Sequence, residues 1–317
     1  MSPAAAPYRL PPVPYVRLAF TLRALAPADL PEYQGSMLRG AFGHALRRMV
    51  CVMGREQPCS TCRLRRECVH TRLFETFIEG DPPPLLRGLP TSPRPFIFEP
   101  RGEARHLAAG EDLAFDLLLL GQAADLQAFA ILAVERMAEA GLGRARHRFT
   151  LASVACREPD GRRLDVLGTA GLAPATPSLP TSDLPDASRA LLRFVTPTRL
   201  KIRDHLVATI GFRALAFAML RRTLELAHFH VPGADVDWTF RPLLDQAANV
   251  QVKAANLHWR DWQRYSSRQK TKMSLGGFVG DLELIGDLAP FAPLLRTAEI
   301  LHVGKGATFG LGKMEIG

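Results

Sequence analysis

The chain has 317 residues, enough for two domains of ordinary size, and its 47% apolar and 22% charged residues are the composition of an ordinary globular protein. A net charge of +9 indicates either a polyanionic partner or simple solubility. An apolar stretch at 206–220 is interrupted by Arg213 and is too short to cross a bilayer, and the proline-rich start of the chain does not resemble a signal peptide. Five cysteines without an export signal then predict a protein of the reducing cytoplasm, with no membrane association.

The first half of the chain shows strand and helix patterns in the order βαββαβ. Strands are predicted at 16–24, 95–100, 112–121 and 147–158, and helices at 34–50 and 123–141. A cysteine-rich insert at 51–72 and a proline-rich loop separate the first helix from the second strand.

The same order follows a segment rich in proline, serine and alanine, 171–188, which is typical of a linker. Strands are predicted at 190–197, 250–259, 274–285 and 308–316, and helices at 207–228 and 290–297. The order βαββαβ is that of the ferredoxin-like fold. We therefore expect an α+β protein of two tandem ferredoxin-like (RRM-like) domains, 1–170 with the cysteine-rich insert and 189–317 with a glycine-rich loop.

That glycine-rich segment is "LHVGKGATFGLGK", residues 301–313. It contains Gly304, Gly306, Gly310 and Gly312, with Lys305 between the first two. It lacks the hydroxyl residue, the spacing and the following helix of a P-loop, and it does not open a dinucleotide-binding helix. One interpretation is a hairpin whose glycines serve only the fold. The other is a bare-backbone surface for an extended phosphate backbone, with Lys305 as its charge.

A basic stretch at 252–272 mixes cations with aromatic rings. The cations are Lys253, Arg260, Arg264, Arg268, Lys270 and Lys272, and the rings are Trp259, Trp262 and Tyr265. Single-stranded or looped RNA requires this combination, charge for its phosphates and flat faces for its unstacked bases. The alternative is a strand and turn with its rings in the core and its charges in solvent.

The first predicted helix has an apolar face and a polar face rich in arginine. The polar face carries Arg39, Arg47, Arg48 and its only histidine, His44, together with Gly40 and Gly43. A glycine inside a helix costs roughly 1 kcal/mol relative to alanine, and core packing does not explain glycine on a polar face. We interpret the cleared backbone as a seat for a phosphodiester, although a single helical histidine can also be merely structural.

Four cysteines lie within eighteen residues in "CVMGREQPCSTCRLRRECVH". Cys59 and Cys62 have the spacing of a zinc knuckle, and Cys51 and Cys68 can complete a tetrahedral set, with His70 as a substitute for an outer ligand. Four thiolates would make a closed, structural zinc site. An iron–sulfur cluster and free thiols are the alternatives.

Two of these segments resemble a known family. The runs "MLRGAFGHALRR…CSTCRLRRECVHTRLFE" and "WQRYSSRQKTKMSLGGFVGDLEL…LLRTAEILHVGKGATFGLGKMEI" are similar to the CRISPR-associated endoribonucleases of the RAMP superfamily, which process precursor crRNA. The first run is similar to the cysteine-bearing bacterial branch of that family. Residues 78–250 contribute only the order of elements to the resemblance.

The resemblance implies an enzyme that cuts CRISPR repeat RNA beside a stem-loop without a metal ion, and that keeps its product, in some cases with other Cas subunits. The 2′-hydroxyl would attack the adjacent phosphate and leave 2′,3′-cyclic phosphate and 5′-hydroxyl ends. A non-catalytic RNA-binding subunit of the same superfamily is the alternative.

The resemblance also assigns roles to residues. His44 matches the family's usual histidine, and Tyr33 matches a recurrent tyrosine. Arg39 or Arg47 would stabilise the charge of the transition state, because the usual lysine has no counterpart here. His302, beside the glycine-rich segment, is the rival proton-transfer residue, and we also expect it on the RNA-binding surface with Lys305.

Overall fold

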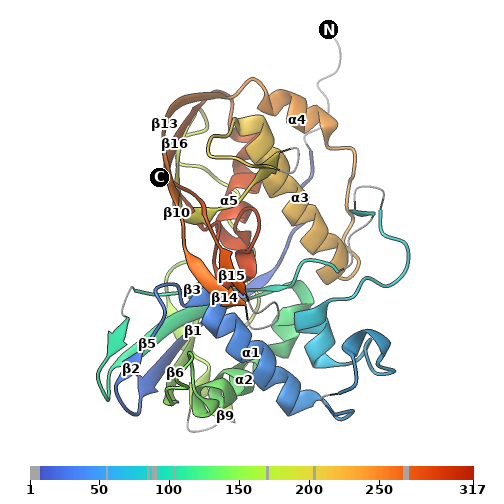
Figure 1. The fold of residues 1–317 in the computed structure, drawn as a ribbon. Coiled ribbons are helices and arrows are strands. Elements are labelled where there is room, and N and C mark those ends of the chain that lie inside the picture. Colours follow the sequence, from blue (N-terminus) through green and yellow to red (C-terminus); the bar gives the residue numbers. More distant parts are fainter. Residues whose placement is uncertain are drawn as a thin grey trace.

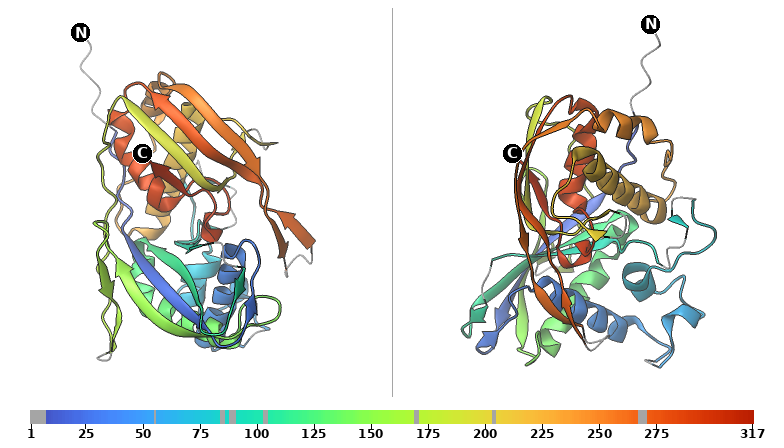
Figure 2. Two further views of the ribbon diagram at one scale, coloured as in Figure 1. Left: turned by 90° about the vertical axis from the view of Figure 1, so that its left-hand side faces the viewer. Right: turned by 45° about the horizontal axis from the view of Figure 1, so that its top comes forward.

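The computed structural model describes residues 8–54, 56–83, 86–87, 91–102, 105–168, 171–202, 205–266 and 271–317. Two antiparallel sheets lie one below the other, each with helices against one face (Figures 1 and 2). No helix in the described part of the chain is long and apolar enough to cross a membrane.

The first half is a ferredoxin-like unit. Its elements are β1 (Tyr15–Ala24), α1 (Gly35–Val50), β3 (Phe96–Pro100), β5 (Asp112–Leu120), α2 (Gln127–Ala140) and β6 (Phe149–Arg157). The sheet has the order β3-β5-β1-β6, and β7 (Arg163–Asp165) extends it at the β6 edge. Alternate residues of the strands, such as Leu18, Phe98 and Leu117, form one core with α1 and α2, as the period-two pattern of a half-buried strand requires.

The second half repeats this arrangement. Its elements are β10 (Arg189–Thr198), α3 (Phe212–His230), β13 (Gln251–Arg260), β16 (Gly277–Ile285), α5 (Ala292–Leu301) and β17 (Met314–Ile316). The sheet order β13-β16-β10-β17 places the four strands in the same permutation as in the first half. A further helix, α4 (Arg241–Ala247), precedes β13. The predicted α+β fold of two tandem ferredoxin-like units is therefore confirmed.

Short elements complete the chain. Paired strands are β2 (Ala28–Asp29) with β4 (His106–Leu107), β8 (Leu167–Gly168) with β9 (Gly171–Leu172), β11 (Lys201–Ile202) with β12 (His205–Leu206), and β14 (Gln263–Ser266) with β15 (Thr271–Ser274). Short 3-10 turns are η1 (Cys59–Thr61), η4 (Gly121–Leu126), η5 (Ala289–Phe291) and η6 (Ala307–Phe309), and η2 (Thr71–Glu75) is a single π-helical turn. The predicted last strand from residue 308 is too long, because the glycine-rich segment turns through η6 before β17 begins at Met314.

The two halves share an interface. Apolar side chains of the first sheet, among them Tyr15, Ile97 and Leu118, pack with Leu226 of α3 and Leu301 of α5. The end of α3 reaches Gly121, where a Cβ would overlap the carbonyl of His230. The C-terminal end of the long helix α3 thus lies at the joint between the halves (Figure 1).

Candidate active site

One row of side chains on α1 faces solvent. Ser36, Gly40, His44 and Arg48 follow at intervals of four residues and therefore lie above one another on the helix. The side chains of His44 and Arg48 are exposed, and a Cβ at Gly40 would meet no other atom within 4 Å. The open backbone predicted on this face is therefore present beside His44, at Gly40.

Gly43 has a different role from the one predicted. A Cβ at this position would overlap the ring of Phe74, which lies in η2 after the cysteine-rich insert. Packing therefore explains this glycine, and the prediction that it clears space for a ligand is wrong. The turn that follows the cysteine-rich insert thus contacts the middle of α1.

The start of α1 meets the glycine-rich segment. A Cβ at Gly35 would overlap the carbonyl oxygen of Phe309, and the hydroxyl of Tyr33 donates a hydrogen bond to the same oxygen. The ring of Phe309 also lies 5.2 Å from the guanidinium carbon of Arg39. The two ends of the chain, which the sequence treats as separate candidate sites, thus form one surface.

Tyr33 itself is part of this joint. Its ring stacks on Trp262 with centroids 4.1 Å apart, and the pair packs with Leu275 and Leu311. Burial raises the pKa of its hydroxyl further above its usual value. A buried hydroxyl that already donates to a carbonyl is a poor proton acceptor, so the geometry does not support the catalytic role predicted for Tyr33.

The four glycines of the glycine-rich segment are required by the segment's own backbone conformation and packing. All four have positive φ angles, between 71° and 87°. A Cβ would lie 2.6 Å from the Arg199 carbonyl at Gly304 and 2.8 Å from a Leu311 methyl at Gly306. At Gly310 and Gly312 it would overlap the carbonyls of Phe98 and Val303.

Burial divides this segment into two parts. Gly310 and Gly312 are buried, so the RNA contacts predicted for them are wrong. Lys305 is exposed between the half-buried Gly304 and Gly306. Within the glycine-rich segment, this turn is therefore the part that a ligand could contact.

His302 is an interior residue rather than a surface catalyst. It is 1% exposed, its Nδ1 lies 3.1 Å from the carbonyl oxygen of Leu311, and its Nε2 lies 3.0 Å from Oε1 of Glu99. No RNA group can reach it in this arrangement, which removes it as the rival of His44. We correct its predicted assignment to the RNA surface accordingly.

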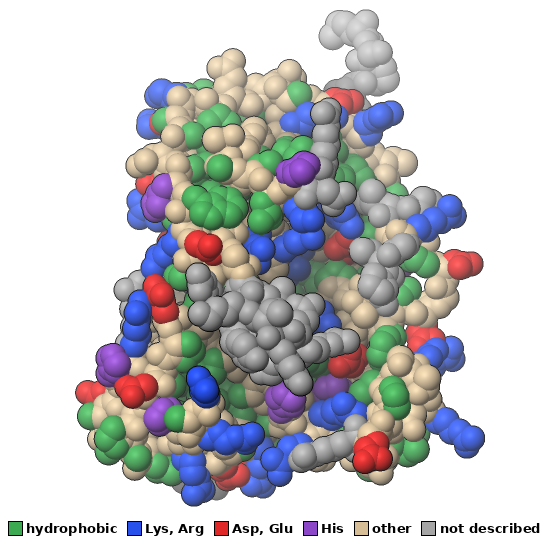
Figure 3. Space-filling view, viewed as in Figure 1, with side chains coloured by type: hydrophobic (Ala, Val, Ile, Leu, Met, Phe, Trp, Pro, Cys, Tyr) green, Lys and Arg blue, Asp and Glu red, His purple; other side chains and the backbone are tan. Residues whose placement is uncertain are grey.

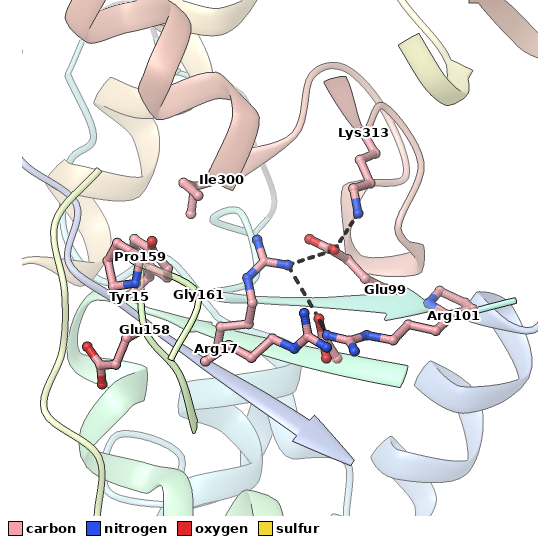
Figure 4. Close-up of a pocket in the computed structure, with 12 residues that line it drawn as sticks. Tyr15, Arg17, Glu99, Arg101, Glu158, Pro159, Gly161, Ile300 and Lys313 are labelled. Atoms are coloured by element: carbon pink, nitrogen blue, oxygen red, sulfur yellow. Dashed lines mark hydrogen bonds and ion pairs between the residues drawn. The ribbon is translucent and has the colours of Figure 1, made fainter. Parts of the chain in front are cut away.

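The carboxylate of Glu99 is bound by side chains from both halves of the molecule. Its Oε2 lies 2.8 Å from Arg17 of β1 and 2.9 Å from Nζ of Lys313 beside β17 (Figure 4). Its Oε1 faces Nε2 of His302. Burial alone would raise the pKa of the Glu99 carboxyl, but the hydrogen bond from His302 and the charges of Arg17 and Lys313 hold that pKa well below its usual range. We call Glu99, His302, Arg17 and Lys313 the Glu99 latch.

The latch borders a charged cleft of about 370 Å³ on the sheet face opposite α1 and α2. Arg101 and Arg157 add positive charge to this cleft, while Asp116 and Glu158 add negative charge (Figure 4). This cleft was not predicted from the sequence. Its acids and arginines are scattered through the chain, and only the sheet register brings them together.

Only part of the basic stretch at 252–272 lies on the surface of the protein. Trp259 is 44% exposed, whereas Trp262 is buried against Tyr33 and supports the guanidinium of Arg260, 4.8 Å from its ring. Nζ of Lys253 lies 3.4 Å from Oε1 of Glu283.

Four other cations of the stretch are not described. Arg264 and Lys272 lie on the β14–β15 hairpin, but their side chains, like Arg268 and Lys270, fall outside the described part of the chain. Lys and Arg side chains gather at the waist between the two halves on the face that carries α1 (Figure 3).

The structure separates the two arginines proposed for charge stabilisation. Arg47 donates a hydrogen bond to the carbonyl of Gln57, 2.9 Å away, and so attaches the cysteine-rich insert to α1. The guanidinium of Arg39 lies against the rings of Phe74 and Phe309, beside the joint between α1 and the glycine-rich segment. This position favours Arg39 over Arg47 as the charge next to a phosphate.

The cysteines do not form a closed ligand set as they are placed. In the described residues no three His, Cys, Asp or Glu side chains gather as metal ligands. Sγ of Cys59 lies 3.8 Å from Nδ1 of His70, a separation that two ligands of one metal can have, and the Cys51 thiol faces the carbonyl of Gly54 at 3.5 Å. Burial lowers the pKa of His70 to about 4, so its ring is neutral at pH 7. The zinc site with Cys62 and Cys68 stays a prediction.

Comparisons with known proteins identify the family. Residues 192–314 match the family described as CRISPR-associated endoribonuclease Cas6, and residues 11–176 match the family AF_1859_N, described as an N-terminal domain. The second half of the chain therefore belongs to the Cas6 family. This family consists of RNA-cleaving enzymes, and the predicted resemblance is thereby confirmed.

Solved Cas6 structures share the fold. A Cas6 product complex has a TM-score of 0.59 at 18% identity, covering 95% of this chain and 99% of its own. The Cas6 of Thermus thermophilus has a TM-score of 0.51 at 17% identity, with 99% and 100% covered. The partial Cas6-RT-Cas1–Cas2 complex has a TM-score of 0.56 at 12% identity, and the match covers 98% of this chain but 47% of that one. None of the curated protein sequences matches the chain.

Three residues that build this site were not identified from the sequence. Phe74, Phe309 and Glu99 act through contacts with residues far away in the chain. The acid Glu99, inside an otherwise apolar predicted strand, is the one hint that was available, because a buried carboxylate requires partners.

Proposed function

We propose that the protein is a metal-independent endoribonuclease that cuts CRISPR repeat RNA beside a stem-loop and retains the product. The observation that carries this proposal is the exposed His44, one helical turn from the open backbone of Gly40, on a helix that contacts the glycine-rich segment of a Cas6-family chain. Product-complex structures among the similar Cas6 proteins support RNA as the ligand.

The cleavage requires a group that transfers a proton and a positive charge that stabilises the transition state. The 2′-oxygen next to the scissile phosphate attacks phosphorus, the bond to the 5′-oxygen of the next nucleotide breaks, and the products carry a 2′,3′-cyclic phosphate and a 5′-hydroxyl. His44 accepts the proton of the 2′-hydroxyl or supplies one to the departing 5′-oxygen, since an imidazole ring can serve as general base or general acid. Arg39 stabilises the negative charge that develops on the phosphorane oxygens.

Binding of the RNA uses the surface around this helix. Arg48 on the His44 row, Lys305 on the exposed turn and Arg260 beside Trp262 supply positive charge, and Trp259 offers an exposed ring for a base. Association with other Cas subunits follows from retention of the product. The Cas6-RT-Cas1–Cas2 complex is a similar structure in which Cas6 is joined to such proteins.

The test uses RNA of the cognate repeat with excess protein in EDTA, so that a single turnover is observed. We expect one specific cut, and no cut when the 2′-hydroxyl at that site is replaced by hydrogen. End analysis should show the cyclic phosphate. Tight binding of RNA that stays intact would instead assign the chain as a non-catalytic RNA-binding subunit. Cleavage that stops in EDTA and returns with a divalent cation would disprove the metal-independent mechanism.

A further inference from the structure

Two aromatic rings from different parts of the chain hold the Arg39 side chain. The guanidinium carbon lies 4.4 Å from the centroid of the Phe74 ring and 5.2 Å from that of Phe309. Phe74 lies in η2, which follows the cysteine-rich insert, and Phe309 lies in η6 of the glycine-rich segment. Contacts of a cation with an aromatic face are worth on the order of 0.5–2 kcal/mol each.

The Phe74 ring is itself fixed on every described side. Gly43 leaves room for it against α1, and the rings of His70 and Phe96 lie nearly parallel to it, with centroids 5.4 and 5.9 Å away. Nε of Arg94 donates a hydrogen bond of 2.6 Å to the backbone carbonyl of Phe74. The ring is therefore a rigid platform rather than a mobile cover.

The Phe309 ring is fixed through its backbone. Its carbonyl accepts the hydrogen bond of Tyr33 and lies against Gly35, and its amide donates to the carbonyl of Gly306 at 2.8 Å. The loop that carries Lys305 and the helix that carries His44 thus meet at this residue.

We propose that Phe74 and Phe309 are positioning residues, which orient the Arg39 guanidinium toward the scissile phosphodiester. This inference rests on the proposed function and gives the cysteine-rich insert a part in it. An arginine side chain carries about 2 kcal/mol of rotamer entropy, and two ring faces remove most of its freedom before RNA binds. The planar group can then meet the phosphate in one orientation, which is what pre-organised electrostatic stabilisation requires.

The test is a double-mutant cycle in single-turnover cleavage at saturating protein. Phe74→Leu and Phe309→Leu keep an apolar side chain and remove the ring, and each should slow cleavage about tenfold. Each should leave the dissociation constant for 2′-deoxy, uncleavable repeat RNA within about twofold. In the Arg39→Ala background, the same changes should slow cleavage no further, because a positioning residue has nothing left to position.

Three controls make the result specific. Phe129→Leu removes an exposed ring on α2, 40% accessible, and should leave the rate unchanged. Phe309→Tyr keeps the second ring, which is only half-buried, and should retain most of the rate. Thermal unfolding of each variant shows whether it is folded at the assay temperature.

The outcomes separate the inference from the function on which it rests. If wild-type protein cuts RNA but Phe74→Leu slows Arg39→Ala by a further factor of about ten, the inference is overturned and Phe74 is merely structural. If wild-type protein binds RNA without cutting it, the proposed function fails. In that case the same cycle in the dissociation constant decides the inference, with non-additive losses supporting it and additive losses overturning it.

Discussion

Nε2 of His302 lies 3.0 Å from Oε1 of Glu99, and this contact joins the last domain of the chain to the first. The histidine ends α5 with a φ of 60°, and the carboxylate lies on β3. Because Arg17 and Lys313 bind the other oxygen, a single buried acid connects strands of one half with the terminal segment of the other. The placement of the glycine-rich segment against α1 depends on this connection.

Replacing the acid tests the latch. Glu99→Gln removes the buried carboxylate that faces Arg17 and Lys313, leaves Arg17 with only its longer contact to Asp116 at 3.6 Å, and should lower the free energy of unfolding by about 3–5 kcal/mol at pH 7. The matched control is Glu79→Gln, which removes an exposed partner of Arg65 and Arg66 and should cost under about 1 kcal/mol. Denaturant unfolding measures both. Equal small losses would show that Glu99 does not hold the halves together.

The latch also predicts a pH dependence. The folded-state pKa of Glu99 lies well below its usual value near 4.5, so its contribution is complete above that value and is lost as the pH falls through the folded-state pKa. The difference in unfolding free energy between wild type and Glu99→Gln should therefore shrink on acidification below about pH 4.5. A difference that grows toward acid pH would contradict this assignment.

Gly40 and Gly43, in the middle of α1, give a matched pair of substitutions. Gly40→Ala adds a methyl group in open space and should stabilise the helix by up to about 1 kcal/mol. Gly43→Ala gains the same propensity, but its methyl group overlaps the Phe74 ring, which His70 and Phe96 hold in place. We expect a net loss of about 1–3 kcal/mol there. Thermal melts of the two variants that shift in the same direction would refute this account of Gly43.

The exposed turn of the terminal segment predicts a salt effect. Lys305→Ala should weaken binding to uncleavable repeat RNA and reduce the slope of log Kd against log salt by about one, as for the loss of one phosphate contact. Lys253→Ala should change the slope less, because Glu283 lies 3.4 Å from that ammonium group. Titrations at several salt concentrations compare the two. A larger change of the slope for Lys253→Ala than for Lys305→Ala would indicate that the RNA lies along the start of β13, where Lys253 is, and not at the turn of Lys305.

The cysteine-rich insert predicts a metal content. We expect stoichiometric zinc in protein purified without chelator, and its loss in Cys59→Ser and Cys62→Ser variants. Elemental analysis measures zinc and iron together. Iron in place of zinc would favour a cluster, and the absence of both would show that the thiols are free.

The elements of the fold could be predicted because each carries its own periodicity. The order βαββαβ was visible twice, and the exposed His44 followed from the helical pattern of 34–50 alone. The terminal segment was misjudged because glycine at positive φ looks the same in sequence whether a ligand or a carbonyl occupies the space of its Cβ. At Gly312 that space belongs to the carbonyl of Val303, and no local pattern shows this.

Residues that act across the domain joint were missed for a related reason. Tyr33 was assigned to catalysis and His302 to the RNA surface, since both lie beside candidate segments. Their burial comes from partners more than 200 residues away, Phe309 for Tyr33 and Glu99 for His302. Local patterns indicate which face of an element is apolar, but they do not indicate which distant element covers a polar side chain.

The most direct test of the proposed catalytic site is the single-turnover cleavage rate of His44→Ala in EDTA, with His106→Ala as its control. His106 is an exposed histidine on β4, paired with Asp29, so its loss removes a histidine away from α1. We expect His44→Ala to slow cleavage by about 10²–10⁴-fold, the usual contribution of a proton-transfer residue, while binding of 2′-deoxy repeat RNA is retained. Cleavage by His44→Ala at the rate of His106→Ala would contradict the assignment of catalysis to this helix.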